Sequence, residues 1–95
     1  MNRLIITPRA ERDLNAIYDY VAQHNPRAAY RIIEGLRAVC DMLKRNSEAG
    51  RRRTDIGADV RSFTRGNYLV LFRTFPEGVE VVRFVDGRRN LKESL

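Results

Sequence analysis

Two copies of one helix-start signal near the N-terminus constrain the fold of this chain most. Thr7-Pro8 and Asn25-Pro26 each place a capping side chain before a proline, whose missing N–H costs nothing at the first helical position. After each signal, apolar residues recur at helical spacing. We therefore predict helices over about residues 8–23 and 26–46. Because only one or two residues separate them, the two helices must turn back on each other as a hairpin.

Short apolar runs of the strand type flank the two helices. The first covers residues 3–7, and three more, at 60–64, 68–74 and 79–85, follow a polar, basic segment and are separated from one another by tight-turn sequences. The tract YLVLF at 68–72 is apolar throughout, which predicts a central strand covered on both faces. The order β-α-α-β-β-β predicts an α+β fold, with a helical hairpin packed on one face of a largely antiparallel four-stranded sheet.

Length and composition limit the classes of protein to which this chain can belong. Its 95 residues predict a single domain over 1–95, and a hydrophobic content of 43% is enough for a core. No run approaches about 18 consecutive apolar residues and none resembles a signal peptide, which excludes a membrane-spanning protein. The single cysteine, Cys40, cannot form an internal disulfide, so we predict a cytoplasmic protein.

Two residues of the second predicted helix bear on its packing. Cys40 lies on the apolar stripe, which predicts a small buried side chain and not a nucleophile. Gly35 lies in the helix interior, where glycine costs about 1 kcal/mol. We predict that a close approach of the two helix backbones compensates for this cost.

The basic side chains are almost all arginine and are unevenly placed. The net charge is +6, and sixteen arginines accompany two lysines. The arginine fork suits phosphate or carboxylate groups, so the bias favours an anionic partner, although a GC-rich genome would produce the same bias. Four arginines and two aspartates lie in residues 50–63, GRRRTDIGADVRSF. We predict that Asp55 and Asp59 pair with part of the arginine cluster at 51–53 and hold this segment against the sheet.

Several short motifs recur along the chain in a characteristic order. The helical half carries the residues Asp13, Leu14, Ile17, Tyr20, Ala22, Asn25, Pro26, Ala28 and Ala29. The other half carries Gly50, Arg51, Arg53, Asp55, Ile56, Val60, Arg61, Phe63, Tyr68, Val70, Phe72, Arg73, Arg83 and residues 87–89. Together they span nearly the whole chain, and with the order of the elements they resemble the RelE/ParE superfamily, small bacterial toxins of type II toxin–antitoxin systems, with the ParE branch favoured. Asp86, Arg88 and Asn90 depart from the family's usual histidine, alanine and aspartate, all within the tail.

The resemblance implies a toxin that poisons DNA gyrase and is neutralised by a cognate antitoxin. It also implies that the first strand lies at an edge of the sheet, beside the last. The RelE branch implies cleavage of mRNA in the ribosomal A site instead, and the shared scaffold cannot decide between the two activities.

The residues available for catalysis favour the first activity. RNA cleavage needs groups that transfer protons, but the only histidine, His24, lies at a helix end. No tyrosine follows the final strand, where the nucleases of the superfamily place theirs. One cysteine and one histidine cannot form a zinc site. We therefore predict a gyrase inhibitor with no catalytic residue, cofactor or metal, and keep a RelE-type mRNA endonuclease as the alternative.

Two interaction surfaces follow from this interpretation. The predicted target-binding surface consists of Arg51, Arg53, Arg61, Arg73, Arg83, Arg88 and Arg89. The predicted antitoxin groove is lined by Leu14, Ile17, Tyr18, Phe63 and Phe72. The partners are then an antitoxin and DNA gyrase, or the ribosome and mRNA in the alternative. The helix faces mix acidic and basic residues, so we expect no sequence-specific DNA binding by this chain alone. The tail at 86–95 is predicted either as a short, weakly docked helix or as a frayed terminus.

Overall fold

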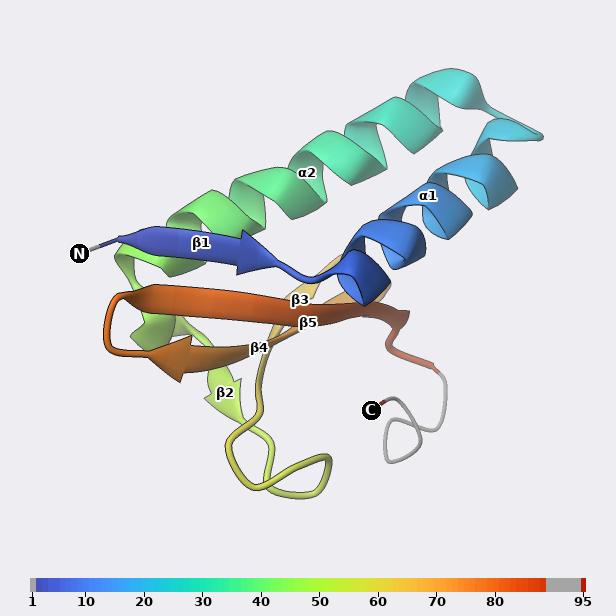
Figure 1. Ribbon diagram of the computed structural model, residues 1–95. Coiled ribbons are helices and arrows are strands. Elements are labelled where there is room, and N and C mark those ends of the chain that lie inside the picture. Colours follow the sequence, from blue (N-terminus) through green and yellow to red (C-terminus); the bar gives the residue numbers. More distant parts are fainter. Residues whose placement is uncertain (1, 89–94) are drawn as a thin grey trace.

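In the computed structural model, which describes residues 2–88 and 95, two helices lie on one face of a five-stranded sheet (Figure 1). The elements in chain order are β1 (Arg3–Ile6), α1 (Pro8–Ala22), α2 (Pro26–Arg45), the short 3-10 helix η1 (Ser47–Ala49), β2 (Arg51–Arg52), β3 (Arg61–Arg65), β4 (Tyr68–Phe75) and β5 (Gly78–Asp86). This arrangement confirms the predicted α+β class and the order of its main elements. None of the helices in the described part of the chain is long and apolar enough to cross a membrane.

Both helices begin where their capping signals predict. The Thr7 hydroxyl accepts a hydrogen bond from the N–H of Ala10 at 3.1 Å, and the Asn25 side chain accepts one from the N–H of Ala28 at 3.1 Å. Each cap satisfies one of the backbone donors that a helix leaves open at its start. The short connection between α1 and α2 folds them into the predicted hairpin.

The strands are ordered β1-β5-β4-β3-β2, with β1 parallel to β5 and the other neighbours antiparallel. β1 therefore lies at an edge beside the last strand, as the resemblance implied. The predicted count of four strands is wrong by one. Arg51 and Arg52 lie in the polar, basic segment, where no strand was predicted, but they pair with Ser62 and Arg61 and form the two-residue edge strand β2. So short a pairing depends on its neighbour β3 and leaves no periodic signal in the sequence.

The sheet buries apolar side chains on both of its faces. Towards the helices, one cluster combines residues of α1 and α2 with alternate residues of β4 and β5, such as Val70, Phe72 and Val81. On the opposite face a smaller cluster contains Val60, Leu69, Leu71, Val82 and Val85, with Ile56 packed against it. β4 is thus covered on both faces, which confirms the interpretation of its apolar tract.

A β-bulge in β5 interrupts its regular pairing with β4. Phe72 lies opposite Val81 and Leu71 lies opposite Arg83, so Val82 has no partner on β4. A bulge changes the direction in which the following side chains point. Arg83 follows this bulge directly, and its side chain reaches α1.

The predicted reason for Gly35 is wrong. A Cβ atom at this position would lie 2.7 Å from Nη2 and 2.9 Å from Nε of Arg65, a residue of β3. The missing side chain therefore makes room for an arginine from the sheet and not for the backbone of α1. Cys40 is fully buried, as predicted.

Candidate functional site

Two carboxylates fix the polar segment between β2 and β3. Arg53 donates two hydrogen bonds to Asp55, at 3.0 and 2.9 Å, which confirms the predicted pairing of Asp55 with the arginine cluster. The Arg53 hydrogen bond is the main reason why the pKa of Asp55 is lowered. Asp59 instead accepts from Arg73 on β4 at 2.9 Å, and this contact lowers the pKa of Asp59. Only the Asp59–Arg73 pair joins the segment to β4, and it does not involve the cluster. The Arg53–Asp55 pair lies within the segment, and Arg53 reaches the sheet through a hydrogen bond that it donates to the Ser62 hydroxyl at 3.4 Å.

Arg83 forms the most enclosed ion pair that the structure gives for its described residues. Its Nε and Nη2 atoms donate to the two carboxylate oxygens of Asp13 at 2.7 and 3.1 Å, and the two side chains are only 12% and 15% exposed. Asp13 also accepts the backbone N–H of Phe84 at 3.0 Å. β1 pairs with β5 only as far as Val81. Further along this edge of β5, the carboxylate of Asp13 on α1 accepts the backbone hydrogen bond in place of a strand. The pair fastens the helices to the sheet.

Arg51 and Arg52 form a cationic edge of the sheet. Both side chains are exposed on β2, and neither makes an ion pair with another described residue. Arg61 lies opposite Arg52 on β3 and donates to the backbone oxygen of Ser47 at 3.3 Å. Like charges on directly opposite residues repel each other. An anionic group bound at this edge would remove that repulsion.

The start of the tail holds the last described arginine. Arg88 is exposed and pairs with Asp86, with its Nη2 2.6 Å and its Nε 3.0 Å from the carboxylate oxygens. The hydrogen bond to Asp86 raises the pKa of Arg88. Arg89, and with it most of the predicted tail, lies outside the described residues.

The described residues bring no set of proton-transfer groups together. His24 is exposed in the turn between the helices, and Tyr68 begins β4 beside α2. Burial raises the pKa of the Cys40 thiol to about 12, so the thiolate nucleophile does not form at neutral pH. No group of three or more histidine, cysteine, aspartate or glutamate residues within the described ranges could hold a metal ion. On the second face of the sheet, the arginines at 53 and 73 are neutralised by carboxylates around an apolar cluster.

The predicted antitoxin groove is divided between core and surface. Leu14 and Phe72 are almost completely buried in the core cluster. Ile17 and Phe63 are half-buried and pack against the same cluster from α1 and β3. Tyr18 is 39% exposed on α1. Only these last three side chains reach the surface.

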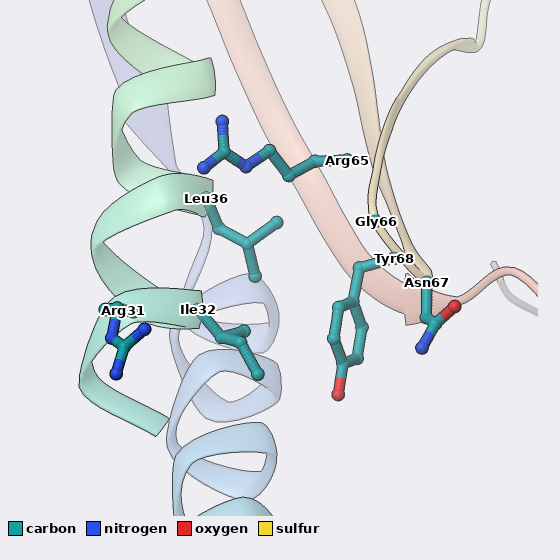
Figure 2. A pocket seen from close by; sticks show the side chains of 7 residues that line it. All are labelled: Arg31, Ile32, Leu36, Arg65, Gly66, Asn67 and Tyr68. Atoms are coloured by element: carbon teal, nitrogen blue, oxygen red, sulfur yellow. The ribbon is translucent and has the colours of Figure 1, made fainter. Parts of the chain in front are cut away.

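A hollow of about 310 Å³ lies between α2 and the turn from β3 to β4 (Figure 2). Ile32 and Leu36 of α2 form one wall, and the ring of Tyr68 faces them from β4. Arg65 extends across the upper part of the hollow in this view, towards α2, and the Asn67 amide lies at its rim. The hollow therefore combines an aliphatic wall with a cation, an arrangement that fits a ligand with one apolar and one anionic group.

Comparison with known proteins decides the family. The sequence pattern of the family described as "ParE toxin of type II toxin-antitoxin system, parDE" matches residues 4–91. The chain belongs to the ParE toxin family. Toxin ParE3 of Caulobacter vibrioides is 30% identical, with 100% of this chain and 96% of the relative covered. Toxin RelE3 of the same organism is 29% identical, with 87% and 91% covered. The chain is also similar to a solved structure described as the chromosomal ParDE TA system from P. aeruginosa, with a TM-score of 0.77, 27% identity and 90% and 96% covered. The protein is thus a type II toxin of the ParE/RelE superfamily.

The sequence analysis did not identify some residues of the arginine edge at β2 and of the hollow beside α2. Arg52 belongs to the same run as Arg51 and Arg53, but the sequence did not show which of the three would find a carboxylate. Arg65 and Ile32 became significant only because β3 folds next to α2. The interior glycine at position 35 was the one local signal for this contact, and its partner could not be read from the chain.

Proposed function

We propose that this ParE-family toxin inhibits DNA gyrase by surface contact and is neutralised by a cognate antitoxin. The observation that carries the proposal is the combination of free arginine forks at the β2 edge with the absence of an acid–base pair among the described residues. A gyrase poison needs no proton-transfer groups of its own, since the tyrosine of gyrase performs the chemistry. A nuclease without such groups would lose much of its rate, because acid–base catalysis contributes typically 100- to 10,000-fold.

The proposed target-binding surface consists of Arg51, Arg52 and Arg61. A guanidinium fork can bind a phosphate or carboxylate through two parallel hydrogen bonds. Arg53, Arg73, Arg83 and Arg88 already bind carboxylates within the chain, so a target would have to displace those partners first. Arg89 remains a further candidate from the sequence.

The proposed antitoxin contact uses the apolar side chains that reach the surface, Ile17, Tyr18 and Phe63. The net charge of +6 favours an acidic partner. An amphipathic helix or extended segment with carboxylates along its polar side would match both the exposed apolar side chains and the positive charge.

The test is a gyrase supercoiling assay with the purified protein. We expect inhibition of supercoiling, with cleaved DNA accumulating, while ribosome-bound mRNA stays intact. The double variant Arg51→Glu/Arg52→Glu should need at least about tenfold more protein for half-inhibition, because two bidentate contacts turn into repulsions. The matched control is Arg12→Glu on α1, which changes an exposed arginine of the other layer.

Three results would contradict the proposal in different ways. Codon-spaced mRNA cleavage with unaffected gyrase would assign the RelE-type activity instead. An unchanged double variant would leave the gyrase activity in place but remove the β2 edge as its contact surface. Inhibition of neither target would leave only the antitoxin interaction.

A further inference from the structure

The outer face of the helical hairpin, which is turned away from the sheet, carries two exposed tyrosines (Figure 1). Tyr18 of α1 is 39% exposed and Tyr30 of α2 is 62% exposed. The ion pair between Glu11 and Arg37, at 3.5 Å, shows which residues of the two helices lie side by side. Tyr18 comes seven residues after Glu11, and Tyr30 comes seven residues before Arg37. Since seven residues make almost two helical turns, the tyrosines lie on the facing sides of the helices, about 10.5 Å along the hairpin from the ion pair.

Four charged residues surround the two tyrosines in alternating signs. Arg12 and Asp19 lie seven residues apart on α1, and Arg27 and Glu34 lie seven residues apart on α2. All four are exposed, and none of them makes an ion pair with another described residue. In the register of the hairpin, Asp19 lies across from Arg27, and Arg12 lies across from Glu34. The four charges therefore occupy the corners of a rectangle whose neighbouring corners differ in sign.

A face with this pattern is complementary to a second copy of itself. Turning the rectangle over, about either axis that lies in its plane, brings each positive corner onto a negative one. Contacts with this two-fold symmetry are the commonest in protein oligomers. The tyrosines lie within the rectangle, and exposed tyrosine is enriched at the centres of protein interfaces. A nucleic acid or an acidic segment matches less well, because its negative charges would meet Asp19 and Glu34.

The size of the face predicts a weak and reversible contact. α1 has 15 residues and is therefore about 22 Å long. Two helices side by side are about 20 Å wide, so two copies would bury roughly 900 Å² in total. Contacts below about 1,200 Å² are typical of transient complexes. The net charge of +6 opposes association. At physiological salt, however, exposed charges more than about 8 Å apart are largely screened from each other.

We propose that this chain forms a symmetric dimer through the outer face of its helical hairpin, with the tyrosines at the centre and the four charged residues in ion pairs between the copies. The face belongs to the helical layer, so the dimer leaves the arginine edge at β2 exposed. The dimer does not depend on the proposed function. Tyr18 also belongs to the proposed antitoxin contact, so an antitoxin bound there excludes the dimer.

The test uses two variants of this chain whose outer faces carry charges of one sign. Asp19→Lys/Glu34→Lys makes all four corners positive, and Arg12→Glu/Arg27→Glu makes all four negative. In sedimentation equilibrium, the wild type should dimerise with a dissociation constant of about 10–100 μM, and each variant alone should associate at least about tenfold more weakly. An equimolar mixture of the two variants should form heterodimers, because opposite charges again face each other.

The matched control changes the net charge as much as the positive variant does. Glu48→Lys/Glu77→Lys alters two exposed residues outside the helical hairpin, and its dissociation constant should stay within about threefold of the wild-type value. Circular dichroism establishes that every variant is folded, which the exposure of all the changed residues favours.

Several results would overturn the proposal. A wild type that stays monomeric up to about 1 mM would show that the face forms no dimer. Variants that dimerise alone, or a mixture that stays monomeric, would place the contact elsewhere. An equal loss in the control would show that net charge governs the association. A monomeric wild type that loses a co-expressed partner protein in the two variants would assign the face to that partner. Because the dimer is measured on the toxin alone, its failure leaves the gyrase proposal in place.

Discussion

Removing the carboxylate of Asp13 should destabilise the fold more than removing any exposed carboxylate. Asp13→Ala deprives Arg83 of its Asp13 counter-charge at a site where its side chain is 12% exposed. It also removes the acceptor for the backbone N–H of Phe84. Breaking a buried ion pair from one side costs about 3–5 kcal/mol, and the small remaining exposure favours the lower end, about 3 kcal/mol. A domain of this length unfolds with an entropy of about 0.2 kcal/mol/K, so we expect the melting temperature to fall by about 15 °C.

The assay is urea denaturation followed by circular dichroism, with the free energy of unfolding obtained by linear extrapolation. Asp13→Asn keeps an oxygen that can accept the N–H of Phe84, so it should lose less than Asp13→Ala. The matched control is Asp59→Asn, which breaks an exposed pair with Arg73 and should leave the melting temperature close to that of the wild type. A loss below about 1 kcal/mol in Asp13→Ala, or an equal loss in the control, would refute the view that this pair fastens the helices to the sheet.

Three further predictions test other parts of the fold. Gly78→Ala should lower the free energy of unfolding by at least about 2 kcal/mol in the same assay, because its Cβ would collide with the backbone of Arg3 on β1; a stable variant would contradict this pairing. Burial raises the pKa of Cys40 to about 12, so a thiol reagent at pH 8 should label it only in denaturant, and rapid labelling of the native protein would show that α2 is open. The Arg73 hydrogen bond lowers the pKa of Asp59 from 3.8, so the small stability that this exposed pair adds is present above that pH and lost as the pH falls further; wild type and Asp59→Asn should differ only slightly at pH 7 and not at all in acid titrations below the lowered pKa, and a difference that grows in acid would contradict this assignment.

Signals within a few residues of each other in the sequence predicted the helices well. The sequence did not predict the features that depend on contacts between distant residues. Thr7 and Asn25 cap their helices through atoms three residues away, so the sequence contains both partners of each hydrogen bond. The Asp13–Arg83 pair joins residues 70 positions apart, and nothing in the neighbourhood of either residue indicates the other.

The candidate surfaces were likewise predicted from local patterns, but the contacts that decide which residues stay exposed were not. The apolar stripe containing Leu14 could not separate core from groove, because helical spacing gives a direction but not what lies opposite. The run Arg51–Arg53 indicated an anionic partner but could not show that Arg53 would bind Asp55 while its neighbours stayed exposed. The unusual glycine at position 35 marked a contact correctly, although its partner lies on β3.

The place of β5 in the sheet has a consequence for the order of events during synthesis. β5 pairs with both β1 and β4 and carries Arg83, yet it is made after all the other strands and both helices. The ribosome adds residues at about 5–20 per second. During that time the apolar face of the helical hairpin is not yet buried against a complete sheet. Proteins that depend on such distant contacts also fold comparatively slowly. The Asp13–Arg83 pair and the β1–β5 pairing can therefore form only once β5 has been made, so the helical hairpin is joined to the sheet after, and not during, the translation of its helices.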